Sequence, residues 1–235
     1  MEESLRRELA HVCQELGARG WVANHDGNVS VRLAEDRFLA SPTAVAKRSV
    51  TPEMCVVVDG QGKVVHGERK VFSEIALHLA CYRARPDVRW VVHSHAPHAT
   101  GWAVAGESFF DPPFMGEPVV SLGDRIPLVP WGGDLALAVA GVDAVLLQSH
   151  GVLTVGKDAE TALLRMELVE HLARIALVAR QLGGPVPLPS SEVDRLLEAR
   201  AKAGLGPQNV PPQGPAPESR PDVEAMVREA LKRLG

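Results

Sequence analysis

The chain has 235 residues, of which 46% are hydrophobic and 23% charged, with a formal net charge of −4. This length and balance fit one ordinary globular domain with a substantial core. The charge offers no basic patch for nucleic acid, and we find neither a signal peptide nor an apolar run long enough to cross a membrane, so nucleic-acid and membrane proteins are not expected.

The cysteines point to a reducing compartment. Cys13, Cys55 and Cys81 are scattered, odd in number and each set in an apolar segment. That arrangement suits neither a disulfide framework nor a C-x-x-C metal site. We therefore expect buried thiols and a cytoplasmic location.

The N-terminal part predicts a helix followed by hairpins. Apolar residues at helical spacing predict an amphipathic helix at residues 2–19. Strands are expected at 29–33 and 37–40, and alternation around D-G-Q-G predicts a further hairpin of 54–59 with 63–65. Because such short turns join antiparallel strands, these hairpins exclude an all-parallel sheet.

The turn H-D-G-N before the first strand has the features of a small anion site. Its Gly27 and Asn28 tolerate positive φ. A loop of that kind exposes backbone N–H groups that can hold an oxyanion. Taken alone, the motif is equally that of a plain hairpin turn.

The run K-V-F-S-E predicts the start of a helix and a carboxylate with a possible role. Ser73 has the character of an N-cap and Glu74 that of the first residue of a helix at 74–84, which ends before Pro86. A carboxylate at a helix N-terminus is favoured as the anion. Glu74 is thus a candidate metal ligand or general base.

The stretch W-V-V-H-S-H-A-P-H predicts a buried strand that ends in histidines. Residues 90–92 are apolar and β-branched or aromatic, and His93 and His95 follow at spacing i, i+2. Side chains at that spacing point to the same face of a strand. Two imidazoles held in this way form half of a divalent-metal site, although ordinary polar strand ends look the same.

A second apolar run ends on a third histidine. The sequence A-V-L-L-Q-S-H-G at 144–151 places His150 at another strand end, before a glycine that can reverse the chain. Three histidines with an open fourth position are the pattern of a catalytic rather than a structural zinc site.

Beyond a long helix predicted at 158–182, the composition changes. Residues 185–235 are rich in proline, with short helices expected at 191–203 and 222–234. We therefore divide the chain into a catalytic domain, 1–184, and a C-terminal extension.

Six short motifs, in this order and spacing, resemble the class II aldolase/adducin family over about four fifths of the chain. They are G-N-V-S at 27–30, S-P-T at 41–43, S-E at 73–74, R-P-D at 85–87, H-S-H-A-P-H at 93–98 and L-L-Q-S-H-G at 146–151. The resemblance implies an α/β fold with three α/β/α layers around a mostly antiparallel central sheet. It also implies a homo-oligomer, commonly a fourfold tetramer, with active sites near subunit interfaces.

The resemblance further implies a metal-dependent lyase. His93, His95 and His150 are expected as metal ligands and Glu74 as the catalytic acid/base. Three imidazoles suit Zn²⁺ best, with Mn²⁺, Co²⁺ or Fe²⁺ as alternatives. The expected reaction is retro-aldol cleavage of a carbon–carbon bond in a sugar or sugar phosphate, through an enediolate.

Residues for the polar head of the substrate follow from the resemblance, except Lys70, which is included as the only nearby cation in the sequence. The set is Gly27, Asn28, Thr43, Lys70 and Ser73, with Glu117 as the nearest proton carrier where the family aldolase has a tyrosine from the neighbouring subunit.

Two departures from the family pattern predict weaker binding of a phosphate group. Phe72 replaces the first of two serines, and Ala44 replaces a common glycine. The substrate is therefore expected to be bound less tightly through phosphate, or to carry none.

Other activities remain open on this sequence. The same chemistry serves 3-oxo acid decarboxylases, sugar-phosphate dehydratases and 4-epimerases. A non-catalytic adducin-like scaffold would be expected to lack the metal residues, and an unrelated metal hydrolase is supported only by the histidine-rich set.

Overall fold

The structure is a computed structural model and describes residues 2–207. The helix expected at 222–234 lies outside the described residues. Among the helices that are described, none combines the length and apolar character that crossing a bilayer requires.

One eight-stranded sheet forms the centre of the described part, with the order β4-β3-β2-β1-β5-β8-β7-β6. All neighbours pair antiparallel except β6 and β7, which are parallel. The strands are β1 (Asn28–Ala34), β2 (Arg37–Ala40), β3 (Val56–Val58), β4 (Val64–His66), β5 (Trp90–Ser94), β6 (Leu128–Val129), β7 (Ala144–Leu147) and β8 (Gly151–Gly156).

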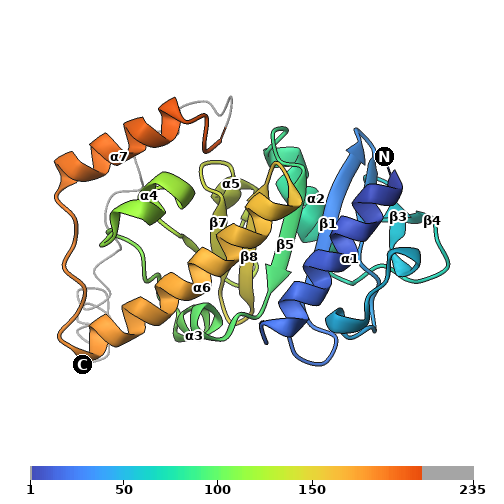
Figure 1. Cartoon of the computed structure of the whole chain (residues 1–235), viewed down its shortest axis with the longest axis horizontal. Helices are drawn as coiled ribbons and strands as arrows, with labels where there is room; N and C mark the ends of the chain where they lie inside the picture. The colour runs from blue at the N-terminus through green and yellow to red at the C-terminus, as the bar shows by residue number, and fades with distance from the viewer. Residues whose placement is uncertain (1, 208–235) are drawn as a thin grey trace, which may run out of the picture.

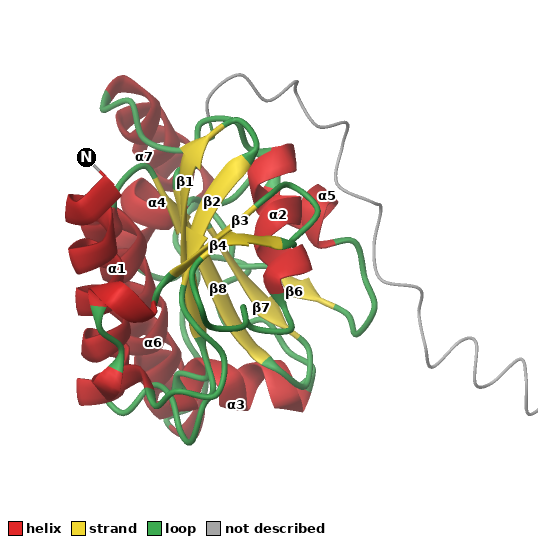
Figure 2. Cartoon of the chain, turned by 90° about the vertical axis from the view of Figure 1, so that its right-hand side faces the viewer, coloured by secondary structure: helices red, strands yellow, loops and turns green. Residues whose placement is uncertain are grey.

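Helices cover both faces of the sheet, which confirms the expected three-layer α/β/α fold (Figure 1, Figure 2). One apolar cluster joins the sheet to α1 (Glu2–Ala18), α3 (Pro97–Ala105), α4 (Gly116–Leu122) and α6 (Ala159–Gln181). A second cluster joins the other face to α2 (Ile75–Ala84) and α5 (Leu135–Val139).

The strand register brings the predicted site residues together. β5 lies between β1 and β8, so that Asn28 pairs with His93, and His93 in turn pairs with Leu153. The turn between β7 and β8 places His150 near the same strand ends. Residues that are distant in sequence therefore share the end of β5.

Neither β8 nor α4 was expected from the sequence. β8 is buried along its whole length, so it lacks the alternation of polar and apolar residues that marks a half-exposed strand. α4 is a helix of seven residues within a proline-rich stretch that shows no clear period. Short or fully buried elements give the weakest periodic signal.

The described part of the C-terminal extension folds back on the rest of the chain. Its helix α7 (Ser190–Lys202) packs on α4 and carries a buried Arg200, which donates to the carbonyl of Val120 at 2.7 Å and to the carboxylate of Asp143. Asp143 is fully buried and also pairs with Arg85 at 2.9 Å and Arg165 at 2.7 Å. This network ties α7 to the start of β7.

Candidate metal centre

His93 and His95 lie at the end of β5, as their spacing predicts. Their ring centroids are 5.1 Å apart. His93 is 1% exposed, and its Nδ1 donates to the carbonyl oxygen of Val152 at 2.8 Å. Since a carbonyl can only accept, Nδ1 carries the proton and Nε2 is left with a free lone pair.

The third imidazole comes from the tight turn before β8. The turn is held by the His150 backbone N–H, which donates to the Leu147 carbonyl at 3.0 Å, and by Ser149 in the left-handed region at φ 56°. The His150 ring centroid lies 4.6 Å from that of His93 and 5.3 Å from that of His95. The three rings therefore surround one point.

Gly151 makes room for this arrangement. A Cβ atom there would lie 2.5 Å from the Ser94 carbonyl oxygen and 2.8 Å from Cδ2 of His95. Such contacts are far inside van der Waals distance, so only glycine lets β8 approach the histidines so closely.

The donor set fits a divalent cation. One ligand atom from each of His93, His95 and His150 lies within 4.8 Å of the others. Nε2 of His93 is buried without a hydrogen-bond partner among the described residues, and it lies 3.6 Å from Oε2 of Glu74, too far for a hydrogen bond. An unpaired buried lone pair is costly unless something binds it, and a cation would do so.

Glu74 lies beside the imidazoles, but not quite as predicted. It is the N-cap of α2 rather than the first helical residue, and its side chain makes no cap hydrogen bond. The carboxylate instead accepts from Nδ2 of Asn28 at 2.8 Å and contacts Nε2 of His150 at 2.7 Å. These two contacts hold it at the cluster, so the helix begins one residue later than predicted.

The electrostatics of the centre favour an ionised Glu74 and a neutral His93. The hydrogen bond with His150 lowers the pKa of Glu74 to about 2 and raises the pKa of His150. Burial lowers the pKa of His93 to about 4, so this ring is neutral at ordinary pH. Neutral imidazole is the form that binds metals.

Sequence reasoning missed one acid near the cluster. Oδ2 of Asp26 lies 3.3 Å from Nδ1 of His95. A carboxylate in that position can orient a metal-binding imidazole through its other nitrogen. The only signal was that Asp26 belongs to the same H-D-G-N turn as Asn28.

The predicted substrate-binding residues do not all lie at the histidine cluster. Gly27 and Asn28 lie at the centre itself: Gly27 has φ 71°, and a Cβ there would lie 3.0 Å from the His93 carbonyl oxygen. Thr43 and Lys70 meet each other through a 3.0 Å backbone hydrogen bond. Ser73, like Lys70, is exposed and adjoins Glu74 in the chain.

Phe72 does not line an open pocket. Its side chain is 6% exposed within the apolar cluster on the α2 side of the sheet, and its ring centroid lies 4.9 Å from that of His78. Phe72, which stands where the family pattern has a serine, therefore contributes packing beneath the site and does not face a phosphate pocket.

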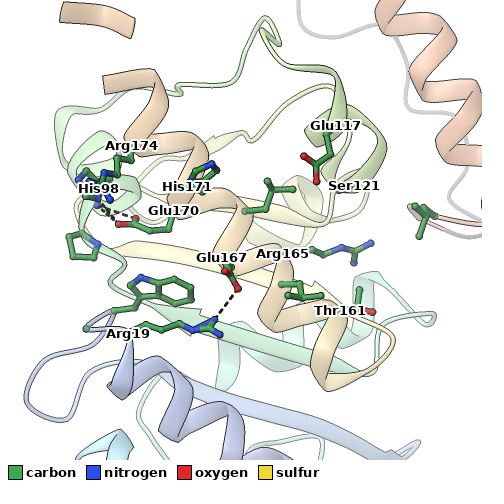
Figure 3. A pocket seen from close by; sticks show the side chains of 16 residues that line it. Arg19, His98, Glu117, Ser121, Thr161, Arg165, Glu167, Glu170, His171 and Arg174 are labelled. Carbon is green, nitrogen blue, oxygen red and sulfur yellow. Dashed lines mark hydrogen bonds and ion pairs between the residues drawn. The ribbon is translucent and has the colours of Figure 1, made fainter. Parts of the chain in front are cut away.

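Glu117 lies away from the histidines, on α4. It lines a groove of about 870 Å³ that follows α6, across from His98 (Figure 3). His98 is held there by Glu170, which accepts from its Nδ1 at 2.7 Å and from its backbone N–H at 3.1 Å. Neither residue therefore joins the three-histidine cluster within one chain.

The fold has three α/β/α layers, and its site combines three converging imidazoles with an adjacent carboxylate. Such a site is typical of an enzyme that uses a divalent cation. The family model described as "Class II Aldolase and Adducin N-terminal domain" matches residues 7–177. The chain belongs to the class II aldolase/adducin family, and within it resembles the aldolase-type lyases.

Three relatives illustrate the range of that family. L-fuculose phosphate aldolase of Escherichia coli K12 is 34% identical over 197 residues, covering 80% of this chain and 89% of the relative. The 3-oxo-tetronate 4-phosphate decarboxylase of the same organism is 30% identical over 189 residues, covering 76% and 88%. A solved structure of L-fuculose 1-phosphate aldolase superposes with a TM-score of 0.76 at 28% identity, covering 83% of this chain and 95% of that one.

Proposed function

We propose that the protein is a metal-dependent class II aldolase that cleaves a carbon–carbon bond of a sugar or sugar phosphate by a retro-aldol reaction. The observation that carries this proposal is the open cluster of three imidazoles with Glu74 hydrogen-bonded at its edge. The similarity to a sugar-phosphate aldolase supports the same class of substrate.

His93, His95 and His150 would hold the cation, and we propose Zn²⁺ because three neutral imidazoles with an open position are typical of catalytic zinc. Mn²⁺, Co²⁺ and Fe²⁺ are the alternatives. When bound, a divalent cation stabilises negative charge that develops on substrate oxygen atoms.

Glu74 is the proposed acid/base. In the retro-aldol direction a hydroxyl loses its proton, the carbon–carbon bond breaks to release an aldehyde, and the electron pair remains on the carbon beside the carbonyl group. We propose that Glu74 takes up the hydroxyl proton and returns a proton to that carbon, with Asn28 donating to Oε2 and Oε1 facing His150.

The low pKa of metal-free Glu74 does not argue against this role. Its largest cause is the hydrogen bond with His150. A bound cation would change the surroundings of Glu74, so this pKa describes the metal-free protein alone.

Recognition of the polar head of the substrate is proposed for Gly27, Asn28, Thr43, Lys70 and Ser73. Glu117 is proposed as a second proton carrier. Since Glu117 is exposed on α4 and apart from the cluster of its own chain, it would act in the site of a neighbouring subunit.

A homo-oligomer, and in particular a tetramer, is part of the proposal. α6 and its C-cap residue Leu182 present apolar side chains that a monomer would leave in water: Leu164, Val178 and Leu182 are 52%, 51% and 83% exposed. Light scattering coupled to gel filtration would give the number of chains, and a monomer would remove the proposed role of Glu117.

A cytoplasmic location is proposed from the cysteines. Cys13, Cys55 and Cys81 are all buried free thiols, as expected. Burial raises the pKa of each to about 12, which leaves them unreactive in a reducing compartment.

Decarboxylation of a 3-oxo acid is the second candidate, favoured by the similarity to a decarboxylase. Dehydration and 4-epimerisation need the same carbanion chemistry. A scaffold without catalysis is disfavoured because the three histidines and Glu74 assemble in one place. The deciding experiment is incubation of metal-loaded protein with ketose phosphates, free ketoses and 3-oxo sugar acids, followed by product mass: two fragments indicate aldol cleavage, and loss of CO₂ or water indicates the alternatives.

A further inference from the structure

A line of buried polar side chains leads from the interior to Glu74. The hydroxyl of Tyr82, the only tyrosine in the sequence, lies 2.8 Å from Oγ of Ser30, which lies 2.7 Å from Nδ1 of His78. Nε2 of His78 lies 2.7 Å from Oδ1 of Asn28, and Nδ2 of Asn28 donates to Oε2 of Glu74 at 2.8 Å. The line thus ends at the carboxylate proposed to move the proton.

All members before Glu74 are shielded from water. Ser30 and His78 are 0% exposed, Tyr82 is 3% and Asn28 is 4%. Apolar side chains could fill the same volume without any need for partners, and a buried polar group is costly unless each of its bonds is made. The line therefore calls for an explanation beyond packing.

The direction of every hydrogen bond can be assigned. An ionised carboxylate only accepts, so the Asn28 NH₂ group must face Glu74 and its Oδ1 must face His78. An amide oxygen also only accepts, so His78 carries its proton on Nε2. Nδ1 of His78 is then an acceptor for the Ser30 hydroxyl, and Ser30 in turn accepts from Tyr82.

The assignment is consistent because His78 is neutral. Burial lowers its pKa to about 3, so a single ring proton is present. Reversing the Asn28 amide would place its oxygen against the carboxylate and its NH₂ group against the protonated Nε2. Both contacts would be repulsive, so one orientation of Asn28 follows from one tautomer of His78.

We propose that His78 is a positioning residue: with Ser30 and Tyr82 behind it, it locks the Asn28 amide as a hydrogen-bond donor to Glu74. Glu74 Oε2 is thereby fixed, and Oε1 remains toward His150. This inference rests on the proposed function only in so far as Glu74 carries the proton.

Two amide substitutions at His78 separate positioning from packing. His78→Gln places an amide near the position of Nε2 and keeps a donor for Asn28, whereas His78→Asn places its amide near Nδ1, keeps a partner for Ser30 and leaves Asn28 Oδ1 without a donor. Both remove the same ring, so their packing losses are similar. We expect kcat of His78→Asn to be about tenfold or more below that of His78→Gln, with KM little changed. Equal kcat values would overturn the positioning role.

A second measurement does not depend on turnover. Nitrogen-15 NMR of the histidine rings in metal-free protein should show His78 as the neutral Nε2–H tautomer, with its signal identified by its absence in His78→Gln. An Nδ1–H tautomer would overturn the proposed direction of the line. If wild type cleaves no candidate substrate but shows the expected tautomer, the reaction is misassigned and the hydrogen-bond line stands.

Should His78→Asn fail to fold, Ser30→Ala carries the same test. It removes one hydroxyl and no ring, and it deprives Nδ1 of its donor. We expect the Nε2–H tautomer to be retained, because Oδ1 of Asn28 still needs a donor, and kcat to fall several-fold because the ring loses one of its two hydrogen bonds. An Nδ1–H tautomer or an unchanged kcat would overturn the proposal.

Discussion

Nε2 of His150 lies 2.7 Å from Oε1 of Glu74, so one contact links a proposed metal ligand to the proposed acid/base. The bond lowers the pKa of Glu74 and raises that of His150. In metal-free protein, His150 therefore keeps its proton to a higher pH than an ordinary histidine. A cation needs the neutral ring, so metal binding must displace that proton.

The first prediction is that Zn²⁺ binding releases a proton and strengthens as pH rises through the raised pKa of His150. Below that pKa, each pH unit should weaken binding about tenfold. Calorimetry in two buffers with different heats of ionisation measures the released protons. In Glu74→Gln, His150 loses its anionic partner, so fewer protons should be released at neutral pH. The same release in both proteins would contradict this linkage.

The second prediction concerns the ligand set. Purified protein should bind about one divalent ion per chain, and His93→Ala, His95→Ala or His150→Ala should lose it. His98→Ala is the control, since His98 pairs with Glu170 in the α6 groove. Elemental analysis after gel filtration measures occupancy, and a His150→Ala protein that keeps its full metal content would remove His150 from the set.

The third prediction concerns Glu74. Glu74→Gln keeps the size of the side chain and removes the base, so turnover should fall by about 10² or more while the metal stays bound. Steady-state kinetics on the substrate identified by product mass, with metal content in parallel, provide the measurement. Near-normal turnover would place the proton carrier elsewhere, with Glu117→Gln as the next variant.

Much of the centre was predictable because its signals are local. The i, i+2 spacing of His93 and His95 gave their shared face, and the apolar run before His150 gave a second strand end. The resemblance to the family then predicted that the three histidines come together in one site. By contrast, the contacts from Asp26 to His95 and from His78 to Asn28 depend on strand pairing and on helix packing. Spacing along the chain does not encode such contacts.

The α2 boundary and Phe72 show the same limit. A serine followed by glutamate predicts a capped helix, but the tertiary contacts of Glu74 override that local preference. Phe72 occupies the motif position of a family serine associated with phosphate, whereas its side chain packs in the core beside His78. Alignment gives the position of a residue in a motif, and the direction of its side chain depends on the packing around it.

The fourth prediction concerns backbone strain in the loop before Lys47. Ala44 has φ 55°, in the left-handed region, which costs a residue with a Cβ about 1–2 kcal/mol. Glycine relieves that strain but gives up about 0.5–1 kcal/mol of chain entropy. Ala44→Gly should therefore stabilise the fold by up to about 1 kcal/mol in urea denaturation.

Ala46 is a matched control for that prediction. It lies two residues on with φ −59° and ψ 129°, an ordinary extended conformation. Ala46→Gly relieves no strain and should destabilise by about 0.5–1 kcal/mol. Equal effects of the two substitutions would mean that Ala44 is not strained.

The fifth prediction is that metal-free protein loses stability in mild acid because of two buried histidines. Burial lowers the pKa of His78 to about 3 and that of His93 to about 4. In the unfolded chain both titrate near about 6.5. Below that pH the two histidines bind protons in the unfolded state but not in the folded state, so the free energy of unfolding falls as pH falls.

The other members of the centre do not offset this loss in the same window. The lowered pKa of Glu74 gives stability that is complete above its unfolded value and is lost only at lower pH. The raised pKa of His150 gives stability that is already complete below the unfolded value for histidine. Between about pH 6.5 and about pH 5, His78 and His93 together should cost about 3 kcal/mol.

Urea denaturation of chelator-treated protein at these two pH values measures the effect. His78→Gln removes one of the two titrating rings, so the loss between the two pH values should be about half that of wild type, whatever the absolute stability of the variant. Saturating Zn²⁺ should steepen the loss, since protons then compete with the ion for His93 and its neighbours. A free energy of unfolding that stays level across this range in metal-free wild type would mean that water reaches both rings, because exclusion from water is the largest cause of their low pKa values.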